Sequence, residues 1–381
     1  MKNNLIAGHV RFEGVKGVGT MDINFAPDKN AYVLIGENGI GKTKFLESLF
    51  VTLFISHNAV IKKNPFIEKK NLPFSNVEIN EHNFQPETKF IVNKEELGDF
   101  TTHSLPIVYL SASNRNNIKI IDAACFFKLG NQQDRFDNHL EYLLTYLLDG
   151  SKRLAHCDTN VSLNEWIVQR AQSANKYQSK EDNREVEITT LLTLLNKIDE
   201  RIDAEFLEIA GNGRVFIQVE GQKRELSELS SGFTAILKIL QAIIAGYSYF
   251  TNEVHIQQVR GMVLIDEIES HLHNEWQVNI VPLLKTLFPN TTFVITTHSS
   301  LVISQLAQGE AYRLTRHDDG VVYGELIENP NKIPFVDLIH NAFGVDLNQV
   351  KINRTKAADQ TQAKQALLAL VERELAQLET E

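Results

Sequence analysis

Cysteine is nearly absent from this sequence of 381 residues, which contains only Cys125 and Cys157. Two cysteines are too few for the disulfide framework of a secreted protein, and neither belongs to a Cys-x-x-Cys pair. The N-terminus, Met-Lys-Asn-Asn-Leu, also lacks the hydrophobic region of a signal peptide. We therefore expect a cytoplasmic protein.

Long apolar runs are absent as well. The longest candidate covers residues 45–55 and is interrupted by Glu47, whereas a helix needs about 18 apolar residues to cross a bilayer. We therefore expect no membrane segment, and we interpret residues 45–55 as part of a buried helix.

An excess of positive charge is the third absence. The chain has 38 Lys and Arg residues against 48 Asp and Glu residues, which gives a net charge of −10. A protein that coats nucleic acid indiscriminately is normally basic, so any DNA contact must come from a local patch. Such patches are more often solvated faces. The candidate basic clusters are Lys62-Lys63, Lys69-Lys70, Arg115 with Lys119, and Lys351 with Arg354 and Lys356.

The hydrophobic pattern of the first half predicts strands and then a helical block. Its composition, with 43% hydrophobic and 23% charged residues, is that of a globular protein. Apolar residues at helical spacing predict two helices within residues 136–206, and the second of these helices includes Ile202. The other expected elements are strands at 5–12, 20–25, 31–35 and 105–111 and a helix at 42–55.

From residue 209 onward, apolar strands alternate with helices, which is typical of a parallel sheet covered on both faces. The expected elements are strands at 214–219, 262–266 and 292–296 and helices at 233–246 and 274–287. The whole pattern predicts an N-terminal lobe (1–125), a helical insertion or lid (126–208), a C-terminal lobe (209–330) and a helical tail (331–381). The apolar stripe of the tail is expected to pack on its own domain and consists of Leu368, Val371, Leu375 and Leu378.

A glycine-rich loop follows the expected strand at residues 31–35 and fits the pattern G-x-x-x-x-G-K-[ST]. Its residues are Gly36, Glu37, Asn38, Gly39, Ile40, Gly41, Lys42 and Thr43. Glycines let successive backbone N–H groups converge on a phosphate, and the start of the next helix adds positive potential. We expect Lys42 to bridge the β- and γ-phosphates of ATP and the Thr43 hydroxyl to bind Mg²⁺.

Two further motifs end apolar strands downstream. Met262–Ile265 is followed by Asp266 and Glu267, and two carboxylates at the end of a buried strand are unfavourable unless a cation meets them. We expect Asp266 to hold Mg²⁺ and Glu267 to activate the attacking water. His298 follows the next strand and is placed to contact the γ-phosphate.

A second helix cap lies between these motifs, at Leu229-Ser230-Ser231-Gly232-Phe233. Ser230, Ser231 and the Gly232 amide at a helix N-terminus form a second phosphate-binding turn. A single nucleotide does not need two such turns. We therefore expect this one to serve the ATP held by a second copy of the chain.

Together these motifs resemble those of ABC-type ATPases of the RecF/SMC-like branch, over about residues 1–55 and 210–330. The run Asp266-Glu-Ile-Glu269-Ser-His271-Leu-His273 resembles more closely the stand-alone ATPases of bacterial anti-phage systems, Septu-like or overcoming-lysogenization-defect-like but without the Toprim nuclease. The resemblance implies a P-loop ABC-type head, with a mixed N-terminal sheet, a parallel core sheet flanked by helices, and a helical insertion.

The resemblance also implies how the residues act. ATP and Mg²⁺ lie between two heads in a head-to-tail homodimer or higher homo-oligomer, Glu267 is the catalytic glutamate, His298 is the switch histidine, and residues 269–273 cross the seam. The stretch Ser111-Ala-Ser-Asn-Arg115 resembles a family segment near the nucleotide and implies a structural or nucleotide-side role for Arg115. Phe233 and Asn274 depart from the residues commoner at their positions, and Gln85 is only a weak candidate for the Q-loop glutamine. These departures favour slow hydrolysis.

The chain has no segment that resembles a nuclease domain, so the expected partner is a separately encoded effector, a nuclease. The alternative is a RecF-like DNA-repair or recombination ATPase that binds DNA directly. A transporter subunit is disfavoured because the interval from Lys42 to Ser230 is roughly twice that of the class. His271 and His273 lack the further ligands of a zinc site.

Overall fold

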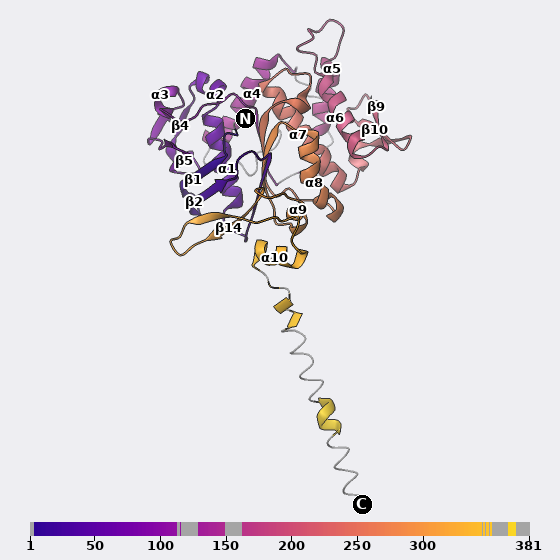
Figure 1. The fold of residues 1–381 in the computed structure, drawn as a ribbon. Coiled ribbons are helices and arrows are strands. Elements are labelled where there is room, and N and C mark those ends of the chain that lie inside the picture. Colours follow the sequence, from indigo (N-terminus) through magenta and orange to yellow (C-terminus); the bar gives the residue numbers. More distant parts are fainter. Residues whose placement is uncertain are drawn as a thin grey trace, which may run out of the picture. The chain divides into compact units, whose positions relative to one another are not determined.

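The computed structural model describes residues 4–112, 115, 129–148, 162–344, 346, 348–349, 351–352 and 365–370 (Figure 1). The chain divides into two compact units, Met1–Asn331 and Lys332–Glu381. Several residues named above lie outside the described residues: Lys119, Cys125, Cys157, Arg354, Lys356, Val371, Leu375 and Leu378.

A ten-stranded sheet forms the centre of the first unit, in the order β6-β5-β1-β2-β15-β14-β3-β13-β12-β8. The strands from β14 to β8 pair in parallel, whereas β6, β5, β1 and β2 pair antiparallel. The predicted fold class, a mixed N-terminal sheet with a parallel core, is thereby confirmed. The bounds are β1 (Gly8–Val15), β2 (Gly19–Phe25), β3 (Ala31–Ile35), β5 (Asn76–Ile79), β6 (His82–Phe84), β8 (Ile107–Leu110), β12 (Gly261–Ile265), β13 (Thr291–Thr296), β14 (Ala311–Arg316) and β15 (Val322–Leu326).

The parallel strands are apolar throughout because both of their faces are covered. Side chains alternate between the faces of a strand, and Leu34 of β3, Leu264 of β12 and Val294 of β13 enter the core that surrounds α1 (Lys42–Ile55). Their neighbours Val33 and Val263 are equally buried. The parallel pairing brings the carboxyl ends of β3, β13 and β12 to the same edge of the sheet.

The remaining elements flank this sheet. Figure 1 shows α3 and the N-terminal strands on one side of the first unit and α5, α6, β9 and β10 on the other. The helices are α2 (Asn58–Lys63), α3 (Lys94–Leu97), α4 (Gln132–Leu148), α5 (Leu163–Ser173), α6 (Glu185–Ile198), α7 (Ser231–Phe250), α8 (Asn274–Leu287) and α9 (Ser300–Ile303). Two smaller sheets pair β4 (Phe66–Glu68) with β7 (Lys89–Ile91), and β9 (Ile202–Ile209) with β10 (Val215–Val219) and β11 (Gln222–Glu225).

The prediction that residues up to 206 are helical is wrong at its end, because Ile202 begins β9. Asp199 stops α6: its carboxylate accepts hydrogen bonds from the backbone N–H of Arg201 at 3.1 Å and from the Arg201 guanidinium at 2.8 Å. This local turn competes with continued helix. Ile202 keeps the helical spacing by coincidence and is buried as the first residue of a strand.

Helix α7 is longer than the predicted 233–246 and is apolar over most of its length. Among the described residues it is the single helix that could cross a membrane by length and composition, with a mean hydropathy of 1.4 over its best window, yet 78% of that window is buried inside the protein. This window is longer than the run at residues 45–55 that was expected to be the longest apolar candidate, and the polar residues Lys238 and Gln241 interrupt it. Its burial is typical of a core helix.

A buried ion cluster joins the helical block to the end of α7. The Glu187 carboxylate of α6 accepts hydrogen bonds from Arg170 Nε of α5 at 2.9 Å and from Arg184 Nε at 2.6 Å. Arg184 also donates to the Asn252 carbonyl, and Arg135 of α4 donates to the Asn252 side chain. The helical block is therefore fixed to the segment that follows α7.

In the second unit the described residues include α10 (Phe335–Phe343) and a helical turn at 365–370. Leu368 lies in this turn, whereas Val371, Leu375 and Leu378 lie outside the described residues, so the expected packing of the tail stripe stays a prediction.

Candidate nucleotide site

The P-loop connects β3 to α1, as predicted. Gly39 and Gly41 have φ angles of 80° and 112°, which side chains with a Cβ rarely adopt. A Cβ at Gly41 would also lie 2.9 Å from the Val18 side chain. The loop therefore depends on glycine for both its backbone conformation and its close packing, and it ends at the first residue of a 14-residue helix.

Lys42 lies within this loop and is only 6% exposed. Its Nζ donates to the carbonyls of Gly36 at 2.8 Å and Glu37 at 3.0 Å. Burial lowers the pKa of Lys42 to about 8, although the carboxylates of Asp266 and Glu267 act in the opposite direction. A phosphate group beside this ammonium would stabilise its charged form.

Thr43 and Asp266 meet directly although they are far apart in sequence. Thr43 Oγ1 lies 3.1 Å from Asp266 Oδ1 and 2.9 Å from Oδ2. Asp266 is 3% exposed, and burial raises the pKa of its carboxyl. A hydroxyl and a carboxylate are ligands that Mg²⁺ accepts, and the cation would offset the unfavourable burial of the carboxylate. These residues therefore fit a magnesium ion.

Glu267 has a left-handed backbone conformation, with φ of 45°. Its N–H donates to Thr296 Oγ1 at 2.8 Å, and its carbonyl accepts from Arg115 Nη1 at 3.2 Å. Arg115 also donates to the carbonyls of Asp266 and Ser111. Since Arg115 is 4% exposed, it supports the backbone under the two carboxylates and does not belong to a DNA-binding patch.

His298 follows β13 and is half-buried. Its backbone N–H donates to Glu269 Oε1 at 2.6 Å, and the Thr297 hydroxyl donates to Glu269 Oε2 at 2.7 Å. The carboxylate of Glu269, expected in the seam segment, is therefore engaged within its own chain. No motif in the sequence predicts this link between the loops after β12 and β13.

The turn at residues 229–233, which is expected to bind phosphate, lies at the start of α7 as predicted. Ser230 is the N-cap, and its Oγ accepts from the Phe233 N–H at 3.3 Å. Ser230 and Ser231 are exposed, whereas Gly232 is buried. A Cβ at Gly232 would lie 3.2 Å from the His273 ring and 3.5 Å from the His271 carbonyl. The structure thus places this turn beside the residues that follow Glu269.

Gln85 was the wrong candidate for the Q-loop. It follows β6, the edge strand, and β5, β1, β2, β15 and β14 separate that strand from β3. The strand beside β12 is β8. The segment that follows β8, which begins at Ser111, lies next to Asp266, as the shared contact with Arg115 shows.

Two of the candidate basic clusters form ion pairs within the chain. Lys63 pairs with Asp137 of α4 at 2.7 Å, and Lys70 pairs with Glu68 at 2.5 Å. These pairs compensate part of the positive charge that a DNA patch would need.

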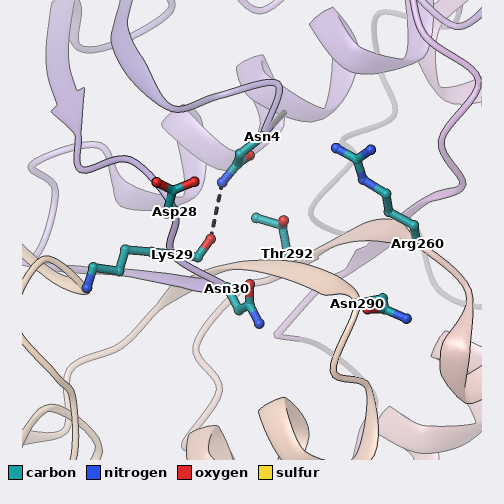
Figure 2. A pocket seen from close by; sticks show the side chains of 7 residues that line it. All are labelled: Asn4, Asp28, Lys29, Asn30, Arg260, Asn290 and Thr292. Atoms are coloured by element: carbon teal, nitrogen blue, oxygen red, sulfur yellow. Dashed lines mark hydrogen bonds between the residues drawn. The ribbon is translucent and has the colours of Figure 1, made fainter. Parts of the chain in front are cut away.

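A separate pocket lies at the opposite ends of the strands (Figure 2). It holds about 130 Å³ near the amino ends of β3 and β13, and Asn4 donates to the Lys29 carbonyl beside it. Because the P-loop follows the carboxyl end of β3, this pocket is not part of the P-loop site. The lining residues are Asn4, Asp28, Lys29, Asn30, Arg260, Asn290 and Thr292.

Comparison with known proteins shows which families and proteins this chain is similar to. The family described as "AAA domain, putative AbiEii toxin, Type IV TA system" matches residues 130–304. The Septu protein PtuA of Bacillus thuringiensis is 23% identical over 339 residues, which cover 85% of this chain and 80% of that protein.

A retron Vc95 probable ATPase of Vibrio cholerae serotype O1 biovar El Tor is 23% identical over 81% of this chain and 72% of its own length. Among solved structures, an SMC head bound to the C-terminal winged-helix domain of ScpA is 13% identical over 85% of this chain and 99% of that chain, with a TM-score of 0.45. The resemblance to Septu-like ATPases that the motifs predict is confirmed by PtuA and by the retron ATPase.

Proposed function

We propose that this chain, a relative of the Septu protein PtuA and of retron ATPases, binds ATP with Mg²⁺ at the carboxyl ends of β3, β12 and β13 and hydrolyses it. The observation that carries the proposal is the contact of the Thr43 hydroxyl with both carboxylate oxygens of Asp266, at 3.1 and 2.9 Å. This pair stands beside the buried Lys42. A hydroxyl, a carboxylate and an ammonium together provide ligands for a magnesium–triphosphate complex.

In this mechanism the P-loop N–H groups and Lys42 hold the triphosphate, and Thr43 and Asp266 hold the metal ion. Bound Mg²⁺ would neutralise charge on the phosphate oxygens. Glu267 orients the attacking water and accepts its proton, and His298 contacts the γ-phosphate. The strained backbone of Glu267, held by Thr296 and Arg115, supports this role because it fixes where the side chain starts.

We further propose that Ser230, Ser231 and Gly232 bind the γ-phosphate of the ATP held by a second copy, so that ATP assembles a head-to-tail homodimer or higher homo-oligomer. Support comes from the exposure of Ser230 and Ser231 at the start of a 20-residue helix, whose N-terminus favours anions. The adjacent segment that follows Glu269 is exposed at His271 and His273.

The ATPase cycle is proposed to control a separately encoded effector, a nuclease, in anti-phage defence. The relatives support this assignment, since they are a Septu protein and a retron ATPase. Direct binding of DNA, as in a RecF-like repair ATPase, is less favoured because Lys63 and Lys70 are paired within the chain.

The test compares ATP hydrolysis and mass in solution for the wild type, Lys42→Ala and Glu267→Gln. We expect the wild type to release phosphate, Lys42→Ala to lose nucleotide binding, and Glu267→Gln to bind ATP and remain a dimer while turnover falls about 10²–10³-fold or more. A Glu267→Gln protein that hydrolyses ATP at the wild-type rate contradicts the assignment of the water to Glu267.

A second measurement distinguishes the two candidate functions, control of a separate nuclease and direct binding of DNA. Hydrolysis is followed with and without duplex DNA at two salt concentrations, and the products of neighbouring genes are tested for co-purification. A bound nuclease supports effector control, whereas stimulation by DNA with a steep salt dependence supports the repair function.

A further inference from the structure

The carboxylate of Glu269 makes two hydrogen bonds that the expected roles of the motif residues do not require. Each carboxylate oxygen accepts one bond, from the His298 N–H at 2.6 Å and from the Thr297 hydroxyl at 2.7 Å. Short bonds to a carboxylate are the stronger class of hydrogen bond in proteins. The two donors belong to consecutive residues, so the carboxylate fixes the backbone that carries the switch histidine.

The bonds of Glu269 continue a ladder between the loops after β12 and β13. Glu267 N–H donates to Thr296 Oγ1 at 2.8 Å, and Ile268 N–H donates to the Thr296 carbonyl at 3.1 Å. Ile268 is fully buried, so this part of the segment is anchored in the core. The ladder therefore links the two loops by four hydrogen bonds.

At its other end the same segment reaches the turn at residues 229–233 that begins α7, the signature turn. The Glu269 carbonyl accepts from the Leu272 N–H at 2.9 Å, and Leu272 is 6% exposed. His271 and His273 then pack against Gly232, where an added Cβ would stand 3.2 Å from the His273 ring. One short turn therefore touches the switch histidine loop on one side and the signature turn on the other.

We infer that Glu269 is a positioning residue that couples His298, which reads the γ-phosphate of the chain's own ATP, to the signature turn, which serves the ATP of the second copy. This inference rests on the proposed function. A change in the position of His298 when the γ-phosphate leaves is transmitted through the Glu269 carboxylate to residues 270–273 and on to Gly232. The residue thereby makes the two composite sites respond to each other.

The test uses Glu269→Ala and Glu269→Gln, with Glu275→Ala as the matched control. Glu275 is an exposed carboxylate in the first turn of α8, so its removal changes the net charge equally without touching the His298 loop. The glutamine amide can still accept from the His298 N–H and donate to the Thr297 hydroxyl. We expect Glu269→Ala to lower kcat roughly 10–100-fold with KM for ATP within about threefold, and Glu269→Gln to recover most of the loss.

A double-mutant cycle distinguishes positioning from a general structural role. If Glu269 acts through His298, Glu269→Ala lowers kcat in the wild type but adds no further loss to His298→Ala. ATP-dependent dimerisation, measured by light scattering in the Glu267→Gln background, is expected to weaken with Glu269→Ala and not with Glu275→Ala.

The outcomes separate this inference from the proposed function. If the wild type hydrolyses ATP and the Glu267→Gln protein dimerises, but Glu269→Ala matches Glu275→Ala or multiplies the loss of His298→Ala, the coupling is refuted and the proposed function stands. If the wild type does not hydrolyse ATP, both fail. Should Glu269→Ala not fold, Thr297→Val, which removes one of the two donors to the Glu269 carboxylate, takes its place in the same cycle. A lower kcat that adds no further loss to His298→Ala supports the coupling, and an unchanged kcat or a multiplied loss refutes it.

Discussion

Thr296 is the residue whose substitution tests the site most sharply. It is fully buried at the end of β13, where its hydroxyl donates to Asp266 Oδ1 at 2.6 Å and accepts from the Glu267 N–H at 2.8 Å. Thr296→Val keeps the shape and removes both bonds. The Asp266 carboxylate then loses one donor and the Glu267 N–H loses its acceptor.

The magnitude follows from what each bond contributes. A hydrogen bond to a charged group contributes about 1.5–3 kcal/mol, and an orphaned buried N–H costs about 1–3 kcal/mol. Because the two terms share one side chain and are not additive, we expect Thr296→Val to lower the free energy of unfolding by about 3–5 kcal/mol. The Glu267 backbone, already at φ of 45°, loses one of its supports, so kcat should fall at least about tenfold.

The same strand supplies a matched control. Thr291, at the opposite end of β13, is also fully buried, and its hydroxyl makes a single neutral bond with Tyr247 at 2.6 Å. Thr291→Val leaves the buried Tyr247 hydroxyl without this partner, so it is expected to lower the unfolding free energy by about 1–3 kcal/mol and to leave kcat within about twofold. Urea unfolding and phosphate release are measured for both variants. Equal losses of stability and activity in the two variants would refute the reasoning.

Three further predictions concern buried charge. Burial holds the pKa of Lys42 at about 8, below its ordinary 10.5; the charged form is therefore unfavourable in the folded state below pH 8, and the penalty fades between pH 8 and 10.5. Lys42→Met should therefore raise the free energy of unfolding by about 2–3 kcal/mol at pH 7 and by little at pH 10.5. If urea unfolding gives the same increase at both pH values, the prediction is contradicted. Burial also lowers the pKa of His57 to about 4 from 6.5. Because the unfolded chain therefore binds a proton at higher pH than the folded chain, stability should fall as the pH drops from 6.5 towards 4. His57→Phe should flatten this pH dependence of the unfolding midpoint, and an unchanged slope would show that other groups cause the dependence. Glu187→Gln should destabilise the protein by about 3–5 kcal/mol, because Arg170 and Arg184 lose their shared carboxylate. Glu185→Gln, which changes an exposed carboxylate, is the control in thermal unfolding. Equal unfolding midpoints for the two variants would refute a stabilising role of the cluster.

Elements with strong local signals could be predicted from the sequence. Strand β3 (Ala31–Ile35), helix α1 (Lys42–Ile55) and helix α8 (Asn274–Leu287) have the predicted bounds. Each is set by its own residues: an apolar run, a glycine-rich loop or an amphipathic repeat. The P-loop, Asp266 and His298 were found for the same reason, because each follows a buried strand.

The contacts that complete the site leave no such local signal. Arg115 reaches the Glu267 carbonyl across 152 residues of sequence, and Glu269 reaches the His298 N–H across 29. The resemblance of residues 111–115 to a family segment near the nucleotide implies a structural or nucleotide-side role for Arg115, but no local pattern indicates which carbonyls its guanidinium contacts. The end of α6 was missed for a different reason, since the Asp199 turn outweighs the helical spacing of Ile202.

The position of β13 also sets the order in which a newly made chain can become active. β13 lies between β3 and β12 in the sheet, so Thr43 and Asp266, which are 223 residues apart in sequence, acquire their final neighbours only after residue 296 has left the ribosome. At translation rates of about 5–20 residues per second, synthesis of the intervening chain takes roughly 11–45 s. Nascent chains and fragments that stop before this strand would carry an intact glycine-rich loop and still be unable to consume ATP.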